Sequence, residues 1–499
     1  MKTRRAALGF FILALAGAAC GAPVSMGDAA RAPEPPPPVI GFVTLASDDG
    51  SAIKADITFE SVTFPTDASG AAEAIWPEEP AEVKISATGF LDYSTTIAQL
   101  PETGVFEAVL TPRRLSGTVV GPGGVPLPRT TVIQGGAEVV TDDSGEFLLT
   151  RVEPGVIEAS RPAWEPASLA WDGTSDAVTV EMEPRLIRAL RVQGAKAGNP
   201  SQWRDLLDLA EQSGVNAFVL DTKNEGGTVF HDTEVRLAHE ISAVQAFYDL
   251  DQVIADMDAA GLYKITRIVT FQDDPLARAR PEIAAMDSET GEQWRNYKGL
   301  RWLDPTDRES WEYSLALAEE ACRRGFDEIQ FDYIRFPSDG PIRTLVFDEP
   351  YTQEVREATI AAFMEAAYDL LNPMGCAVAA DIFAITLESS TDEGIGQRPQ
   401  QMSYYADVLS PMIYTYTYGP GWKGFDNPNE HPVEIVSTAL DNGAPKLEGH
   451  SIYRPWIQTW LLEAEEIVAV QQVAEERDLG WMIWSANTLY SMNFLPDPE

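Results

Sequence analysis

The sequence predicts a multidomain protein in which two small all-β sandwich modules precede a C-terminal (β/α)8 TIM barrel. A length of 499 residues exceeds what one hydrophobic core normally supports, so several domains are expected. Short alternating strands broken by Gly and Pro fill residues 39–183, as is typical of β-sandwiches. After Pro184, apolar strands alternate with helical periods, which predicts βα units around a parallel sheet.

The N-terminus has the features of an export signal. Basic residues open the chain, and the apolar stretch over residues 6–16 is too short to span a bilayer. The run Leu15-Ala16-Gly17-Ala18-Ala19-Cys20 resembles a bacterial lipoprotein signal, although a larger aliphatic residue is commoner than Gly17. That resemblance implies a signal peptide over residues 1–20 and a membrane-anchored lipoprotein of the bacterial cell envelope, lipidated on Cys20. Ordinary cleavage near Ala19 is the alternative.

Residues 21–38 end in a run of prolines, which predicts an extended linker. Two modules are expected next, over residues 39–113 and 114–184, because one turn motif occurs twice. Thr66-Asp67-Ala68-Ser69-Gly70 returns as Thr141-Asp142-Asp143-Ser144-Gly145, and a strand follows each copy. In each copy the aspartate can bond its own backbone and the glycine supplies a positive φ.

The second module opens with Leu115-Ser116-Gly117-Thr118-Val119, and the segment from Thr141 to Phe147 lies in its middle. In these two segments it resembles the carboxypeptidase regulatory-like family. The resemblance implies a spacer or adhesion element. We expect residues 21–183 to fold separately from the barrel.

The barrel is expected over residues 185–499, because eight apolar strand candidates occur there with helices between most of them. An open doubly wound sheet is disfavoured, because no Gly-rich phosphate loop follows the first strand. The expected strands are 187–192, 217–220, 265–271, 328–334, 377–383, 408–414, 453–458 and 481–485. The expected helices include 203–213, 250–260, 310–324, 353–371 and 461–477.

Composition restricts the partners. The 77 acidic and 36 basic residues give a net charge of −41, which disfavours binding to nucleic acid. Four scattered histidines and three cysteines offer no ligand spacing for a metal, and we expect no cofactor. Cys322 and Cys376 either form a disulfide or stay as buried thiols.

Candidate site residues are those at the C-terminal ends of the strands, where TIM barrels carry their active sites. Asp332 and Asp381 fall at the ends of neighbouring strands, among aromatic and amide side chains. Such a pair suits sugar chemistry, in which one carboxylate stabilises an oxocarbenium-like transition state and one carboxylic acid protonates the leaving oxygen.

Six motifs follow one another along the barrel sequence. They are Phe326-Asp327-Glu328-Ile329-Gln330-Phe331-Asp332-Tyr333-Ile334-Arg335-Phe336-Pro337, Ala380-Asp381-Ile382-Phe383, Gly394-Ile395-Gly396-Gln397, Ser410-Pro411-Met412-Ile413-Tyr414, Arg454-Pro455-Trp456 and Gly480-Trp481-Met482-Ile483-Trp484. With these motifs the barrel sequence resembles a bacterial family of predicted glycoside hydrolases, formerly a domain of unknown function. The resemblance covers roughly residues 186–490 and implies a barrel related to α-amylase-like and exopolysaccharide-hydrolase superfamilies.

By that resemblance Asp332 is the nucleophile or charge stabiliser. Asp381 is the candidate general acid, although a glutamate is commoner at this place, and Glu388 and Asp392 are its rivals. Substrate-binding candidates are Asp221, Lys223, Arg335, Tyr414, Trp456, Gln458, Trp484 and Asn487. For several of them a structural role is an open alternative: Asp221 and Lys223 as a buried ion pair, Arg335 as a partner of Asp332 or of the barrel wall, and the aromatic residues as packing.

The sequence therefore predicts an exported glycoside hydrolase that acts on a polysaccharide. A non-catalytic carbohydrate-binding or envelope scaffold lipoprotein is the first alternative, and a lyase or deacetylase is the second. Because adjacent strands lie about 4.8 Å apart, the two carboxyl groups can approach the ~5–5.5 Å separation of retaining enzymes.

Overall fold

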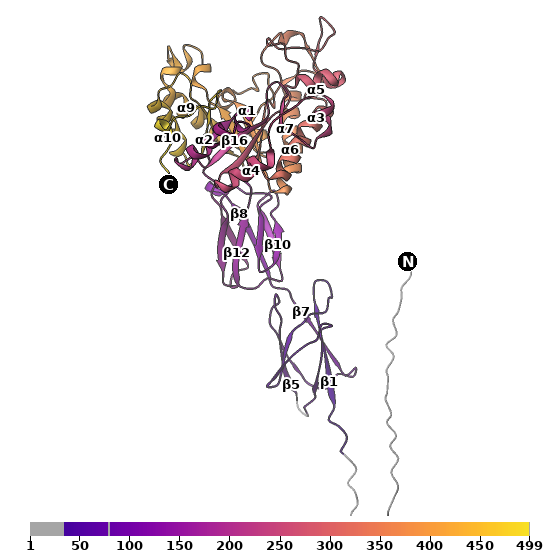
Figure 1. Ribbon diagram of the computed structural model, residues 1–499. Helices are drawn as coiled ribbons and strands as arrows, with labels where there is room; N and C mark the ends of the chain where they lie inside the picture. Colours follow the sequence, from indigo (N-terminus) through magenta and orange to yellow (C-terminus); the bar gives the residue numbers. More distant parts are fainter. Residues whose placement is uncertain (1–33, 78–79, 499) are drawn as a thin grey trace, which may run out of the picture. The chain divides into compact units, whose positions relative to one another are not determined.

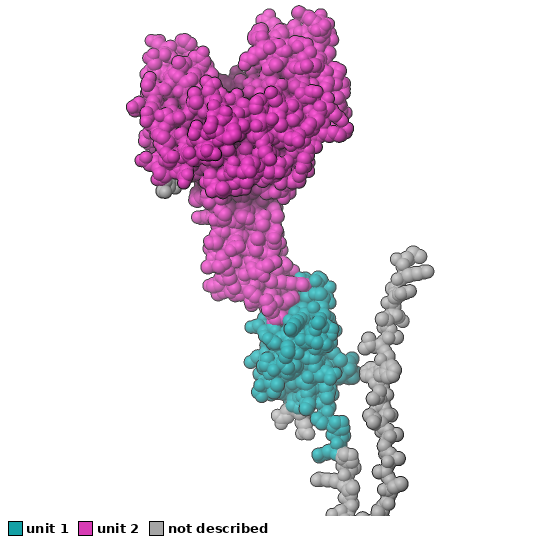
Figure 2. All heavy atoms as spheres, in the orientation of Figure 1, with its two compact units in different colours: residues 1–86, 92–109 teal, residues 87–91, 110–499 magenta. Residues whose placement is uncertain are grey.

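The computed structural model describes residues 34–77 and 80–498, so the signal peptide, Cys20 and most of the expected linker lie outside the described residues. The chain divides into two compact units (Figure 2). The first unit consists of two segments, the residues up to Ser86 and Asp92–Val109. The second unit consists of Ala87–Leu91 and Leu110–Glu499. Among the described residues, no helix is long and apolar enough to cross a membrane.

The first unit consists of two antiparallel sheets. One has the order β4-β1-β7 and the other β3-β2-β5-β6. The sheets contact each other through Phe42 and Phe59, whose rings lie 5.3 Å apart edge to face. The strands are β1 (Val39–Ala46), β2 (Asp56–Phe59), β3 (Val62–Pro65), β4 (Ala71–Ile75), β5 (Ala81–Ser86), β6 (Tyr93–Ile97) and β7 (Val105–Leu110).

The second unit begins with another pair of sheets, ordered β11-β8-β14 and β10-β9-β12-β13. The repeated turn motif explains one corner: Asp142 accepts hydrogen bonds from the backbone of Ser144 and Glu146. Gly145 has a φ of 71°, and a Cβ there would lie 2.6 Å from the Val119 carbonyl. The strands are β8 (Arg114–Val120), β9 (Thr131–Gln134), β10 (Ala137–Val140), β11 (Glu146–Thr150), β12 (Gly155–Ser160), β13 (Ala167–Trp171) and β14 (Ala177–Glu181).

The rest of the second unit is a closed barrel of eight parallel strands surrounded by helices, which confirms the predicted TIM barrel (Figure 1). Each expected strand is present within a few residues of its expected bounds. In barrel order the strands are β15 (Arg188–Val192), β16 (Ala217–Lys223), β19 (Tyr263–Val269), β21 (Glu328–Asp332), β23 (Ala377–Phe383), β24 (Val408–Met412), β26 (Trp456–Gln458) and β27 (Trp481–Trp484). Strand β15 pairs with both β16 and β27, and this closes the barrel.

Further short strands and the helices complete this unit. Strands β17 (Val229–His231) and β18 (Val244–Tyr248) follow β16, β25 (Ile452–Tyr453) pairs with β24, and β20 (Met286–Asp287) pairs with β22 (Leu345–Val346). The longer helices are α2 (Pro200–Glu211), α4 (Leu250–Ala259), α6 (Glu309–Arg324), α7 (Gln353–Leu371), α9 (Pro432–Gly443) and α10 (Ala464–Glu475). The short ones are α1 (Gly194–Ala197), α3 (Arg236–Glu240), α5 (Asp274–Ala279) and α8 (Pro399–Met402).

The barrel core holds a few buried polar contacts that tie distant elements together. Arg454 pairs with Glu328 at 2.7 Å, and both side chains are buried. A disulfide joins Cys322 of α6 to Cys376, just before β23, with the Cα atoms 6.0 Å apart. Of the two alternatives that the sequence left open for these cysteines, the structure therefore contains the disulfide.

The second sandwich packs against the N-terminal end of the barrel. The barrel residues Ala377, Ala379 and Val408 belong to the hydrophobic core of that sandwich. Arg161, directly after β12, pairs with Asp407 of the barrel at 2.8 Å, and both side chains are fully buried. The expectation that all residues up to 183 fold apart from the barrel is corrected here, because residues 110–183 share a compact unit and a core with it.

Candidate active site

Seven side chains form a closed ring of contacts near the C-terminal ends of the barrel strands. Consecutive members are linked by ion pairs, hydrogen bonds or ring contacts. Their order is Arg191 (β15), Asp221 (β16), Arg267 (β19), Asp332 (β21), Asp381 (β23), Trp456 (β26) and Trp484 (β27), which returns to Arg191. Parallel strands present their carboxyl ends at one face, so one position on each of seven strands, all but β24, suffices to build this ring.

Asp332 and Asp381 lie side by side within the ring. In the pairing of β21 with β23, Phe331 is opposite Ala380, and each aspartate follows one of these two residues. The relative exposure of Asp332 is 4% and that of Asp381 is 1%. The structure thus brings together the two carboxyl groups that the sequence singled out.

Burial favours the protonated form of Asp381. It raises the pKa of this carboxyl group well above the usual range, and the neighbouring Asp332 charge raises it further, while the Arg267 charge and the Trp456 hydrogen bond oppose the shift. Trp456 Nε1 donates to Asp381 Oδ1 at 2.7 Å, and Arg267 Nε lies 3.9 Å from Oδ2. Among the described residues no donor forms a hydrogen bond with the buried Oδ2, so a proton on this oxygen lowers the cost of its burial.

Asp332 is surrounded by donors instead. Arg267 Nε lies 2.9 Å and Nη2 2.5 Å from Asp332 Oδ2, and the Tyr333 amide donates to Oδ1 at 2.6 Å. Tyr333 has a φ of 54°, an uncommon conformation for a residue with a side chain, and such strain concentrates at functional sites. The Arg267 guanidinium and the Tyr333 amide thus fix the orientation of the Asp332 carboxyl group.

Arg267 also joins Asp332 to two further carboxylates. Its Nη1 lies 3.2 Å from Asp221 Oδ1, and its Nη2 lies 2.5 Å from Glu225 Oε1. Burial acts to raise the pKa of Glu225, but the Arg267 charge and hydrogen bond lower it to about 2. Glu225 is therefore ionised and cannot serve as a proton donor at neutral pH.

The sequence analysis did not identify Arg191, Arg267 or Glu225. A signal was present for Arg267, which interrupts the apolar strand Tyr263–Val269, because a charge in a buried strand is costly unless it is paired. Its partners could not be read from the sequence, because Asp332 lies 65 residues further along the chain.

Most of the polar residues that were expected to bind substrate are buried and already paired with other protein groups. Asp221 pairs with Arg191 and Arg267, and Lys223 is buried in an ion pair with Asp273 at 2.8 Å. Gln458 is buried as well: it accepts from the Tyr416 amide and donates to the Trp460 carbonyl. Among the expected polar binding residues, Asn487 is the one that is exposed to solvent.

The three aromatic binding candidates also differ in their exposure to solvent. Trp456 is fully buried and packs edge to face against Trp484 at 5.5 Å, while the guanidinium groups of Arg191 and Arg267 lie over the Trp484 ring. Tyr414 is partly exposed, and its ring lies 5.2 Å from that of Trp460. Tyr414 and Trp484 therefore retain surface that a ligand can contact.

The rival proton donors Glu388 and Asp392 are held elsewhere. Glu388 pairs with Lys423 at 2.6 Å, and Asp392 with Arg356 at 2.7 Å. Burial acts to raise the pKa of Asp392, but the Arg356 hydrogen bond and the amides of Gly394 and Gly396 lower it. These contacts favour Asp381 as the acid.

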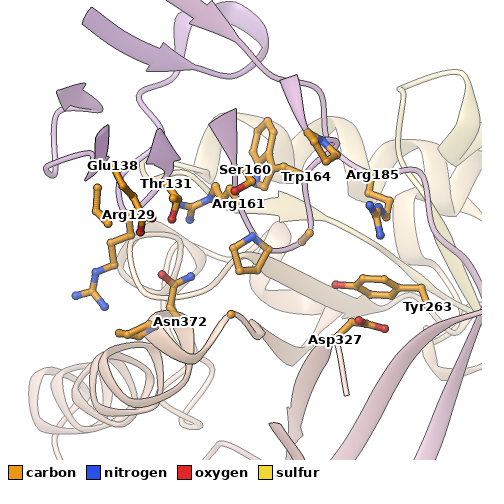
Figure 3. A pocket seen from close by; sticks show the side chains of 16 residues that line it. Arg129, Thr131, Glu138, Ser160, Arg161, Trp164, Arg185, Tyr263, Asp327 and Asn372 are labelled. Carbon is orange, nitrogen blue, oxygen red and sulfur yellow. The ribbon is translucent and has the colours of Figure 1, made fainter. Parts of the chain in front are cut away.

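The face that carries the ring is open to solvent. Figure 2 shows unit 2 hollowed between the part that carries α9 and α10 and the part that carries α3 and α5. A separate cavity of about 540 Å³ lies at the other end of the barrel, between sandwich residues such as Trp164 and barrel residues such as Tyr263 (Figure 3). Within the described ranges, no group of three or more His, Cys, Asp or Glu side chains could hold a metal ion.

The chain is thus a TIM-barrel protein with two neighbouring carboxyl groups at the C-terminal ends of its strands. Residues 189–490 match a family described as "Putative glycosyl hydrolase domain". The match covers more than half of the chain, and the protein belongs to this family. None of the curated proteins matches the chain.

Several solved structures resemble the chain. A hypothetical protein from Ruminiclostridium thermocellum is 33% identical over 38% of this chain and 96% of its own, with a TM-score of 0.36. The PgaB (BpsB) glycoside hydrolase domain from Bordetella bronchiseptica is 11% identical over 61% of this chain and 95% of its own, with a TM-score of 0.45. An alpha-amylase from Lactobacillus plantarum is 15% identical over 62% and 75%, with a TM-score of 0.40.

Proposed function

We propose that this protein is an exported glycoside hydrolase that cleaves glycosidic bonds of a polysaccharide with Asp332 and Asp381. The observation that carries the proposal is the adjacent pair of carboxyl groups at the ends of β21 and β23: burial raises the pKa of Asp381 well above its usual range, and Arg267 donates two hydrogen bonds to Asp332. Two neighbouring carboxyl groups in different environments can provide an acid and a nucleophile.

In this mechanism Asp381 transfers its Oδ2 proton to the glycosidic oxygen as the bond to the anomeric carbon breaks. Asp332 attacks the anomeric carbon and forms a covalent glycosyl intermediate. Asp381, now ionised, accepts a proton from the water that releases the sugar. Retention is favoured because Asp332 and Asp381 end two paired strands, which lie about 4.8 Å apart, whereas an inverting water needs a carboxyl separation of ~6.5–9.5 Å.

The proposal is tested by incubating purified protein with a panel of polysaccharides and detecting new reducing ends by mass spectrometry. Cleavage of any panel member supports it. The second candidate is a non-catalytic carbohydrate-binding or envelope scaffold protein, which the deep burial of Asp332 and Asp381 favours. Binding of a glycan without any cleavage would identify that function instead.

Activity should depend on pH through Asp381. Because burial and the Asp332 charge raise its pKa, Asp381 stays protonated above the usual carboxyl range, and kcat/KM falls as the pH rises through that pKa. In Asp381→Asn this alkaline limb should disappear. The variant should also lose more activity on substrates with poor leaving groups than on activated aryl glycosides, because only the former need protonation. Rates measured from pH 4 to 10 check this; an unchanged alkaline limb in the variant contradicts it.

We also propose that Cys20 carries a lipid that anchors the protein in the cell envelope, based on the run Leu15–Cys20. The wild-type protein should then sediment with membranes, and Cys20→Ala should be released or keep its signal peptide. Fractionation with intact-mass measurement checks this. A wild-type protein found wholly in the soluble fraction contradicts it.

We assign residues 114–184 to the carboxypeptidase regulatory-like modules, as a spacer between the linker and the barrel. Support comes from the pairing of β8 with β11, the two segments that carry the motif, and from the Asp142 turn.

A further inference from the structure

Arg335 is a buried cation at the mouth of the barrel. It lies in the loop after β21 with a relative exposure of 6%. Its guanidinium carbon is 4.9 Å from the ring centroids of Trp302 and Tyr333 and 4.6 Å from that of Phe383. Its hydrogen bond within the described structure goes from Nη1 to the Phe336 carbonyl, at 3.1 Å.

Arg335 differs from the other buried arginines of the described residues in its partners. Among the described residues, five of the six buried arginines form an ion pair with Asp or Glu, and Arg335 forms none. The paired arginines are Arg161 with Asp407, Arg191 with Asp221, Arg267 with Asp332, Arg356 with Asp392 and Arg454 with Glu328. A buried charge normally requires such a partner, because desolvation is costly.

The aromatic rings compensate for the burial of Arg335 only in part. Burial lowers the pKa of Arg335 from its usual value, while the charges of Asp332 and Asp339 oppose that shift from beyond ion-pairing distance. Stacking on aromatic faces stabilises a guanidinium less than an ion pair does, and it leaves the edge of the planar group free to bond an anion.

The position of Arg335 connects it with the carboxyl pair. Tyr333 directly follows Asp332, and Phe383 lies two residues after Asp381, so two of the rings around the guanidinium stand at the ends of β21 and β23. A sugar bound at the carboxyl pair would therefore place a substituent or a neighbouring residue close to Arg335.

We propose that Arg335 forms a subsite for a carboxylate of the glycan, so that the substrate contains uronic acid residues. This inference rests on the proposed function. A carboxylate matches the planar fork of a guanidinium and would supply the missing partner. The net charge of −41 does not prevent binding, because physiological salt screens exposed charges beyond about 8 Å.

The test uses sugars that differ only in the carboxylate, with the full chain as the protein. Binding of D-glucuronate and D-glucose, and of D-galacturonate and D-galactose, is titrated by NMR. The acid of at least one pair should bind about tenfold or more tightly than its neutral partner, since a hydrogen bond to a charged group contributes on that order. Equal binding within both pairs, or no binding of either acid, overturns the proposal.

Substitutions of Arg335 test whether this residue causes the preference for the acidic sugar. Arg335→Gln should abolish the preference for the acid, and Arg335→Lys should keep part of it, because the charge remains but the planar fork is lost. Arg343→Gln is the matched control, since Arg343 is an exposed arginine of the same loop, and its preference should equal that of the wild type. A preference that survives in folded Arg335→Gln overturns the proposal, and circular dichroism verifies the fold.

The outcome for the subsite is distinct from the outcome for the proposed function. Cleavage of neutral glycans together with equal binding of acidic and neutral sugars would refute the subsite and leave the hydrolase intact. A preference for the acidic sugar without cleavage of any polysaccharide of the panel would refute the hydrolase and leave the subsite intact.

Discussion

Asp332→Asn should reduce turnover by about 10⁴-fold or more while the protein stays folded. Loss of a nucleophile in an enzyme active site costs rate factors of this order. The fold should survive, because the amide is isosteric and Arg267 keeps the carboxylates of Asp221 and Glu225 as partners. Initial rates on a substrate from the polysaccharide panel, with the thermal unfolding midpoint of each sample, measure both parts.

A matched control separates this effect from a general loss of charge. Asp426 is an exposed aspartate in the loops after β24, and Asp426→Asn removes the same charge from a position outside the ring. Its rate should equal that of the wild type. Retention of more than about a tenth of the wild-type rate in Asp332→Asn would remove this residue from the mechanism.

Arg161→Met should lower the free energy of unfolding by about 3–5 kcal/mol, because it leaves Asp407 buried without its cation. Arg129→Met is the matched control. Arg129 also joins the second sandwich to the barrel, through Asp369, but that pair is partly exposed and should contribute about 0–1 kcal/mol. Chemical denaturation of the two variants gives both values.

Removal of both sandwiches should also destabilise the barrel. A protein that begins near Glu183 lacks Arg161 and exposes the apolar surface around Ala377 and Val408, so it should be unstable or insoluble. Equal stability losses in Arg161→Met and Arg129→Met, or a stable truncated barrel, would show that sandwich and barrel do not depend on each other.

The sequence predicted the barrel well, because buried parallel strands appear as continuous apolar runs that can be counted. The strand Ala377–Phe383 and the helix Gln353–Leu371 have their expected bounds. The junction between sandwich and barrel was not predicted, because its central pair joins residues that are 246 positions apart. Nothing local to Arg161 or Asp407 indicates the other residue.

The sequence predicted which side chains lie at the C-terminal ends of the barrel strands, but it did not predict their partners. Asp332 and Asp381 are neighbours because their strands are neighbours. Lys223 also lies at the C-terminal end of a barrel strand, but its ammonium group is buried in an ion pair with Asp273. The position of a residue at a strand end therefore predicts that it lies at this end of the barrel, and its partners decide whether it can reach a substrate.

The central claim is that Asp332 and Asp381 together cleave glycosidic bonds. The most direct measurement is a proton NMR time course that follows the anomeric signals of the first product formed from a cleaved glycan. The account predicts a first product with the anomeric configuration of the substrate from the wild type, and no product from Asp332→Asn. A first product of inverted configuration, or product formation by Asp332→Asn at the wild-type rate, would contradict it.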